Sequence, residues 1–221
     1  MKHKRSMFNV QRSPLIAIAR HRLSTDGTGV TTLVAFHGCP LRCRYCLNSQ
    51  CWEADGIWRW TTPEELVDEL MQDNLYFLAT GGGVCFGGGE PLLQSDFIAR
   101  FCQLCPKEWH IYLESSLQVE QSRLEAVIPC VHHYYIDVKD LQPDIYQQYT
   151  GGTPSLPMAN LQLLADRHLQ QQVTIRLPLI PGYNTDGDRQ HSQQQLEALG
   201  FNSFDFFDYV VPSSAKQSML Q

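Results

Sequence analysis

The sequence predicts an α/β fold in which a mainly parallel sheet forms an open, partial barrel of six β/α units. Short apolar runs alternate along the chain with segments of helical periodicity, which is typical of β/α units. The chain has 221 residues, and 43% of them are hydrophobic, enough to build the core of one domain. Glycine-rich and charged motifs follow the apolar runs, as expected where the carboxyl ends of strands form a site.

The elements are predicted in the following order. Residues 1–30 are expected to form an irregular or hairpin-like lead-in that closes in a turn at 24–29. Strands are predicted at 31–37, 84–86, 110–113, 134–138, 173–177 and 204–211, and helices at 62–80, 97–105, 119–127, 143–149, 158–169 and before Gly200. Thr62, Pro63 and Glu65 predict the start of the first helix, as N-cap, first-turn proline and capping-box residue. No linker divides the chain, so residues 1–221 are expected to form a single domain.

Three cysteines stand directly after the first predicted strand. Cys39, Cys43 and Cys46 have the spacing C-x3-C-x2-C, and thiolates favour iron–sulfur clusters, zinc or Cu(I). A cubane cluster takes four ligands, so three cysteines would leave one iron open, as in reactive rather than structural sites. A zinc knuckle, structural disulfides and unrelated core cysteines are the alternatives. Zinc usually takes two separated ligand pairs, and no second pair lies at that distance from this loop.

The remaining cysteines are expected to be core residues, and they are Cys51, Cys85, Cys102, Cys105 and Cys130. The formal net charge of −6 argues against a nucleic-acid partner. The basic residues 2–5 are expected to be a solvated terminus. No run reaches the roughly 18 apolar residues that span a bilayer, and no secretory signal is visible. We therefore expect a cytoplasmic protein with reduced thiols and no membrane partner.

Polar groups stand at the ends of the later strands. Gly88 and Gly89 allow a ligand to approach the backbone closely, and Glu90 is suited to hold an ammonium group. Charged and polar residues follow the next three strands, namely Glu114, Ser115, Asp137, Lys139 and Arg176. Buried charges need partners, so this ring predicts either mutual pairing or a zwitterionic ligand. A structural network of ion pairs is the alternative.

The cysteine loop and the Gly-Gly-Glu segment together resemble the radical S-adenosylmethionine (SAM) superfamily. The resemblance implies a partial (β/α)6 barrel of the radical SAM type and a 4Fe–4S cluster, held by the three cysteines, whose open iron binds SAM. Tyr45 matches the aromatic residue that packs near the adenine of SAM. The Gly-Gly-Glu segment, Gly88 to Glu90, matches the one that binds its amino group.

The similarity narrows to the activating enzymes of glycyl radical enzymes and covers most of residues 24–185. It includes Thr25 to Gly29, Gly81 to Val84, Asp137 to Lys139, Ile175-Arg176 and Pro181-Gly182. The resemblance implies that Asp137, Lys139 and Arg176 contact SAM. It also implies a monovalent-cation site near Glu114, Ser115, Asp137 and the Tyr135 carbonyl, although the family has Asp-Thr in place of Glu114-Ser115. The family's Pro-Tyr-His after strand six is replaced by residues 208–211, and no ferredoxin-like insert is present.

The implied reaction is reductive cleavage of SAM to a 5′-deoxyadenosyl radical, which removes a hydrogen from a glycine of a partner glycyl radical enzyme. Reduced flavodoxin or ferredoxin is the expected electron donor. One alternative is a radical SAM enzyme that modifies a small molecule or short peptide, similar to 7-carboxy-7-deazaguanine synthase. Another is a non-catalytic iron–sulfur or zinc module. An open sheet edge at strand six, with Phe204, Phe206 and Phe207, is expected to favour docking of a partner over the mouth of the barrel.

Overall fold

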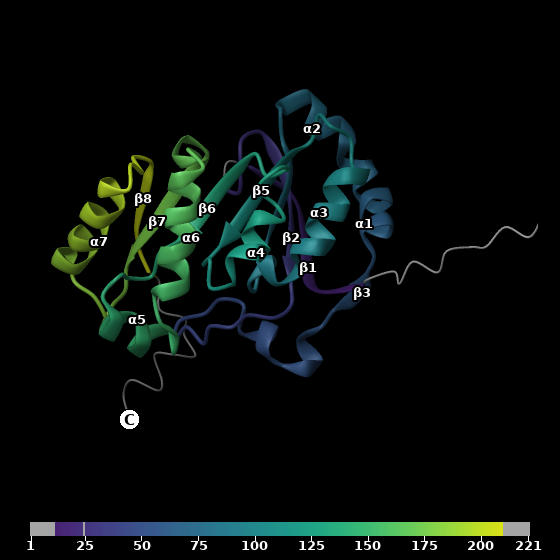
Figure 1. The fold of residues 1–221 in the computed structure, drawn as a ribbon. Coiled ribbons are helices and arrows are strands. Elements are labelled where there is room, and N and C mark those ends of the chain that lie inside the picture. The colour runs from purple at the N-terminus through teal and green to yellow at the C-terminus, as the bar shows by residue number, and fades with distance from the viewer. Residues whose placement is uncertain (1–11, 24, 210–221) are drawn as a thin grey trace, which may run out of the picture.

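The computed structural model describes residues 12–23 and 25–209 as an eight-stranded sheet with seven α-helices. The strand order is β3-β1-β2-β4-β5-β6-β7-β8 (Figure 1). The parallel strands are β2 (Val30–Phe36), β4 (Gly83–Gly88), β5 (His110–Ser115), β6 (His133–Asp137), β7 (Val173–Leu179) and β8 (Phe204–Asp208). These are the six predicted strands. Within the described residues β3 and β8 form the two edges, so the sheet is open rather than a closed barrel.

The lead-in forms an antiparallel extension of this sheet. Strand β1 (Ser13–Leu23) pairs antiparallel with β2, which confirms the hairpin-like lead-in from residue 13 onward. Strand β3 (Arg59–Thr61) then pairs with β1 and was not predicted, because three residues are too few to show a strand period. The basic residues 2–5 lie outside the described residues.

Helices pack along the sheet and connect successive parallel strands (Figure 1). They are α1 (Pro63–Leu70), α2 (Asn74–Thr80), α3 (Ser95–Leu104), α4 (Gln121–Glu125), α5 (Pro143–Thr150), α6 (Ser155–Asp166) and α7 (Asp186–Ala198). The predicted start of α1 is confirmed. The Thr62 hydroxyl accepts the N–H of Glu65 at 3.1 Å, and the Glu65 carboxylate accepts the N–H of Thr62 at 2.9 Å.

The single helix predicted for residues 62–80 is wrong in one respect, because a 3₁₀ turn at Met71–Asp73 divides it into α1 and α2. Asp73 lies in this turn and is buried. Its carboxylate accepts the hydroxyl of Thr32 at 2.9 Å and the guanidinium of Arg20 at 3.1 Å. A buried carboxylate needs such partners, and they come from β2 and β1, so the sheet holds the chain in the turn.

One hydrophobic core lies between the sheet and its helices, and its fully buried side chains include Phe36, Phe86, Leu113 and Ile136. Cys102, Cys105 and Cys130 belong to or pack against this core, as predicted. Cys85 is fully buried in β4, also as predicted.

The loop after β2 and the helix α5 lie at the same end of the sheet, at the bottom of Figure 1. This is the end where the parallel strands terminate, and therefore where a site is expected. Strand β8 stops at Asp208 rather than at the predicted residue 211, and residues 210 and 211 lie outside the described part of the chain. Within that part, no helix is long and apolar enough to cross a bilayer.

Candidate active site

The cysteine loop is fixed by backbone hydrogen bonds to helix α5. The N–H of Arg42 donates to the carbonyl of Thr150 at 2.8 Å, and that of Arg44 donates to Tyr149 at 3.0 Å. These carbonyls belong to the last turn of α5, where helical carbonyls lack partners within the helix. The end of α5 and the cysteine loop therefore satisfy each other's backbone hydrogen-bonding groups.

The glycine segment after β4 is held directly against the same loop. Gly89 donates its N–H to Phe36 at 2.9 Å, and Glu90 donates to Gly38 at 2.8 Å. A Cβ on Gly89 would lie 2.1 Å from the Gly38 carbonyl oxygen, and Gly88 has φ +95°. Both positions therefore require glycine, one for space and the other for backbone conformation.

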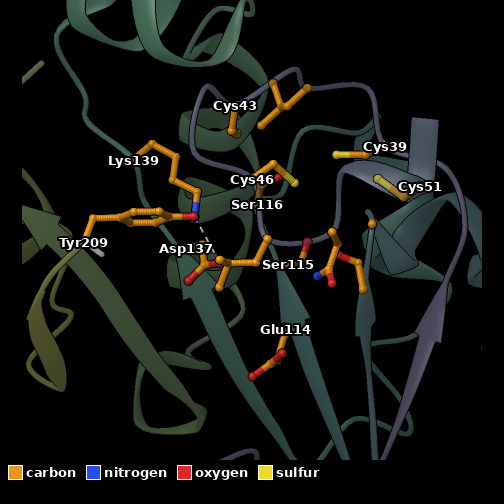
Figure 2. A pocket seen from close by; sticks show the side chains of 15 residues that line it. Cys39, Cys43, Cys46, Cys51, Glu114, Ser115, Ser116, Asp137, Lys139 and Tyr209 are labelled. Carbon is orange, nitrogen blue, oxygen red and sulfur yellow. Dashed lines mark hydrogen bonds and ion pairs between the residues drawn. The ribbon is translucent and has the colours of Figure 1, made fainter. Parts of the chain in front are cut away.

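Most of the predicted site residues line one cavity of about 180 Å³ at this end of the sheet (Figure 2). The predicted residues among its lining are Cys39, Cys43, Cys46, Gly88, Gly89, Glu114, Ser115, Asp137 and Lys139. They come from the cysteine loop and from the ends of β4, β5 and β6. The prediction that the motifs at separate strand ends meet at one point is therefore confirmed.

A second cavity, of about 490 Å³, adjoins the first and shares Glu114, Asp137 and Lys139 with it. Arg176 lines only this larger cavity. Its guanidinium donates to Glu114 at 2.7 Å and lies 4.7 Å from the centre of the Tyr135 ring. Arg176 thus lies beside the cavity that holds the cysteines rather than in it, and its predicted contact with SAM stays a prediction.

An ion pair lines both cavities. Lys139 Nζ lies 3.1 Å from Asp137 Oδ2 (Figure 2). Burial alone would lower the pKa of Lys139, but the interaction with the Asp137 carboxylate and smaller contributions from neighbouring groups outweigh it and raise that pKa above its ordinary value. Lys139 therefore stays cationic. Burial raises the pKa of Glu114, and Arg176 offsets this only in part.

Glu90 and Tyr45 were predicted to contact SAM, and neither lines the cavity. Glu90 is fully buried, and its carboxylate accepts Ser115 Oγ at 2.7 Å, Ser116 Oγ at 2.6 Å and the Ser116 N–H at 2.9 Å. It accepts the N–H of Leu92 as well, at 3.2 Å. These bonds join the glycine segment to the end of β5. Contact with the ammonium of SAM would require an exchange of partners and stays a prediction.

Tyr45 is buried among the rings of Tyr149, Tyr183 and Tyr209. Its hydroxyl donates to the Pro181 carbonyl at 3.1 Å. This packing fixes the backbone next to Cys46, and the predicted contact with adenine stays a prediction.

Six further residues line the cavity without having been predicted as site residues: Leu41, Leu47, Asn48, Cys51, Ser116 and Tyr209. Asn48 donates its amide to the Gly88 carbonyl at 3.0 Å, and Tyr209 donates its hydroxyl to the Tyr45 carbonyl at 2.7 Å. Tyr209 follows the last strand, and Ser116 follows Ser115, so position after a strand was a usable signal for both.

Cys51 is buried, as predicted, but it does not join the core around the sheet. Its thiol lines the same cavity as those of Cys39 and Cys46. Hydrogen bonding with Cys51 lowers the pKa of Cys46 to about 6, whereas burial raises the pKa of Cys43 to about 12. The assignment of Cys51 to core packing alone is therefore wrong, because the chain turns back after Cys46 and returns Cys51 to the site.

Residues 33–192 match the Radical SAM superfamily, a range that includes every predicted site residue. The (2S)-3-sulfopropanediol dehydratase activating enzyme of Klebsiella oxytoca is 34% identical over 81% of this chain and 73% of its own length. The pyruvate formate-lyase-activating enzyme of Staphylococcus aureus strain USA300 is 34% identical over 75% of this chain and 68% of its own. The chain is a radical SAM protein of the glycyl-radical-enzyme activating family.

Solved structures show that this activating enzyme shares the radical SAM fold. SuiB from Streptococcus suis, bound to S-adenosylmethionine, superposes with a TM-score of 0.64 at 12% identity, over 83% of this chain and 43% of SuiB. The AdoMet-bound anSMEcpe superposes with a TM-score of 0.57 at 19% identity, over 79% of this chain and 49% of that protein. This chain thus spans less than half the length of either structure. The partial-barrel class predicted from the sequence is confirmed.

Radical SAM proteins use a 4Fe–4S cluster and SAM, and the donor set of this activating enzyme fits both groups. Cys39, Cys43 and Cys46 offer three soft thiols to one cavity. The backbone of the glycine segment and the charged pair of Asp137 and Lys139 suit a zwitterionic ligand beside them. Within residues 12–23 and 25–209, no three His, Cys, Asp or Glu side chains already stand in a coordinating arrangement. A cubane cluster takes one thiolate on each iron, so the three thiols need not meet around a single ion.

The monovalent-cation site stays a prediction. Glu114, Ser115 and Asp137 line the cavity together, as the resemblance implied. However, Glu114 is paired with Arg176, Asp137 with Lys139, and Ser115 donates to Glu90. Each of the three side chains thus already has a partner within the protein.

Proposed function

We propose that this activating enzyme removes a hydrogen atom from the α-carbon of a glycine in a partner glycyl radical enzyme. The observation that carries the proposal is the sharing of Asp137 and Lys139 by two adjoining cavities. One cavity holds the three thiols, and the other has room for a segment of a partner. A ligand bound between the two cavities would face both the thiols and the partner segment.

The chain's own residues would hold, orient and shield the reactants. Cys39, Cys43 and Cys46 would hold the cluster, and the Asp137–Lys139 pair with the glycine segment would orient SAM. When bound, the cluster and SAM supply a one-electron cleavage of the sulfur–C5′ bond that yields the 5′-deoxyadenosyl radical. The surrounding side chains would exclude water from the site.

The larger cavity suits a polypeptide segment that carries polar groups of both signs. Its lining includes the cations Arg22 and Arg176 and the anions Asp26, Glu114 and Asp205. Glycine is a suitable target because it adopts conformations that other residues avoid and can be looped into a narrow space. A docked partner would also shield the radical, since Phe206 at the β8 edge is 47% exposed and β8 is an open edge in the described sheet.

Two candidate partners follow from the relatives' names: pyruvate formate-lyase and (2S)-3-sulfopropanediol dehydratase. Reduced flavodoxin or ferredoxin would supply the electron, and the cytoplasm would provide the reducing surroundings in which these thiols stay free. The formal net charge of −6 does not favour a nucleic-acid partner.

The test is an anaerobic activation assay with the cluster-loaded chain, SAM and a strong reductant, with and without each candidate partner. We expect a glycine-centred doublet in the electron paramagnetic resonance (EPR) spectrum and 5′-deoxyadenosine equal to the glycyl radical formed. When the partner's glycine is deuterated at the α-carbon, the deuterium should appear in 5′-deoxyadenosine. Cys43→Ala and a partner with alanine at the glycine serve as negative controls.

The competing hypothesis is a radical SAM enzyme that acts on a small molecule or short peptide. It predicts fast, tightly coupled SAM cleavage when a small substrate is added without any partner enzyme. That result, together with no glycyl radical in either candidate, would overturn the proposed function.

A further inference from the structure

Cys51 stands next to the cluster ligands although it lies outside their motif. It belongs to a 3₁₀ turn at Ser49–Trp52 that follows the cysteine loop, and its side chain is 1% exposed. Its carbonyl accepts the N–H of Gly38 at 3.0 Å, and its N–H donates to Asn48 at 2.9 Å. These two bonds close the loop on itself. They fix the backbone of Cys51 beside the residue that precedes Cys39.

The side chains confirm this closure. Figure 2 shows Cys51 and Cys39 side by side at one edge of the cavity, with Cys46 facing them. All three side chains line the same cavity, which places the Cys51 thiol beside two of the three cysteines of the loop. Cys43 lines the same cavity.

We propose that Cys51 is a positioning residue that donates its S–H to the thiolates of Cys39 and Cys46 and thereby raises the reduction potential of the cluster. The inference rests on the proposed function, because it takes these cysteines as cluster ligands. Reduction adds negative charge to the cluster and its sulfurs. A hydrogen bond to a ligand sulfur stabilises the reduced state, which makes it one of the ways a protein sets this potential.

The burial of Cys51 strengthens this effect. An S–H group is a weak donor, but hydrogen bonds gain strength in surroundings of low dielectric constant. Because the backbone bonds to Gly38 and Asn48 hold Cys51 in place, the donor is pre-oriented. A fourth thiolate ligand at this position would instead close the open iron, so a donor role keeps the coordination site for SAM available.

The test is an EPR-monitored redox titration of the anaerobically loaded full chain, alongside iron and sulfide analysis. We expect Cys51→Ala to keep the cluster and to shift the midpoint potential to a more negative value. At a fixed solution potential, the ratio of reduced to oxidised cluster should fall roughly tenfold, which corresponds to about 59 mV for one electron. Cys51→Ser keeps a donor and should retain most of the original potential.

Cys85→Ala is the matched control, since it removes an equally buried thiol that lines neither cavity, and its potential should equal that of the wild type. Cys51→Val provides a second variant without a donor, in case alanine weakens the fold. An unchanged potential in Cys51→Ala and Cys51→Val would overturn the role of Cys51 alone. Loss of iron in Cys51→Ala with retention in Cys43→Ala would make Cys51 a ligand and equally overturn it. Failure of the wild-type chain to bind iron would instead overturn the proposed function.

Discussion

The N–H of Glu90 donates to the carbonyl of Gly38 at 2.8 Å, which ties the glycine segment after β4 to the residue before the first cluster cysteine. The contact leaves no room for a side chain, because a Cβ on the neighbouring Gly89 would lie 2.1 Å from the same oxygen. The two segments predicted to hold the cluster and SAM are therefore positioned by direct backbone contact.

Gly89→Ala should separate these two segments. The added methyl group meets backbone on the cysteine loop, which cannot move as a flexible side chain would, so we expect a loss of roughly 1–3 kcal/mol in the free energy of unfolding and weaker SAM binding. Urea unfolding and calorimetry would measure the two effects. Gly187→Ala in α7 is the control, because its nearest neighbour would be 3.6 Å away. Equal stability of Gly89→Ala and the wild type would contradict the close contact.

Only the cysteines of the loop should be needed for cluster binding. The wild-type chain, reconstituted without oxygen, should bind about four irons and four sulfides. Cys39→Ala, Cys43→Ala and Cys46→Ala should each abolish this, whereas Cys102→Ala and Cys105→Ala should not, because those two side chains pack at the core. Iron and sulfide analysis measures the outcome. Iron loss in either core variant would show that α3 contributes to cluster binding.

Asp137→Asn should weaken SAM binding without loss of iron. Asp137 lines the cavity and carries the charge that pairs with Lys139, so its removal leaves an unpaired cation and one fewer acceptor for SAM. A lost charge-assisted bond costs roughly 1.5–3 kcal/mol, or about tenfold to a hundredfold in affinity. Asp205→Asn is the control, since Asp205 is more exposed and lies 3.9 Å from Arg176. If calorimetry shows the same SAM affinity for Asp137→Asn and the wild type, Asp137 does not contact SAM.

Glu90→Gln separates a structural role of Glu90 from a ligand-binding one. The carboxylate accepts bonds from three neighbouring residues, and an amide nitrogen would face at least one of these donors. We therefore expect a drop of about 1–3 kcal/mol in the free energy of unfolding. Weaker SAM affinity alone, with unchanged stability, would assign Glu90 to the ligand.

Stability should fall in mild acid because of a histidine cluster far along the sheet from the cysteine loop. Burial, and then His132, lower the pKa of His133, and burial and His110 lower that of His132. The rings of His110 and His132 stack at 3.9 Å. Between the unfolded pKa of about 6.5 and the lower folded values, the unfolded chain binds more protons, so stability decreases as pH falls through this window.

The His133→Gln variant isolates this contribution from that of the buried carboxylates. The change in urea midpoint between about pH 7.5 and pH 5.5 should be smaller in His133→Gln than in the wild type. Glutamine keeps a polar group near Thr174, the present partner of His133 at 2.9 Å. An equal change in both proteins would show that His133 does not contribute.

Much of the fold could be predicted because its signals are local. The order of the six parallel strands, the capping box at Thr62 and the thiols of the C-x3-C-x2-C loop all depend on neighbouring residues in the chain. Parallel β/α units also place all strand ends on one side, so the meeting of the cysteines with Gly88 and Asp137 followed from topology alone.

The rest depended on contacts between residues far apart in sequence, which no local pattern encodes. Asp73 breaks the helix after α1 because Arg20 and Thr32 of the sheet bind it. Glu90 is satisfied by Ser115 and Ser116 of the next strand end, and Tyr45 is enclosed by tyrosines from later segments.

Cys51 shows most directly which features the sequence determines and which depend on the folded chain. The sequence determined that a fourth thiol lies five residues beyond the loop's last cysteine, and burial was a reasonable prediction for it. Only the tertiary structure decided what it is buried against, because the hydrogen bond between Cys51 and Gly38 turns the chain back toward the cavity. The direction of a loop is set by the partners that its backbone groups find, and those partners exist only once the chain has folded.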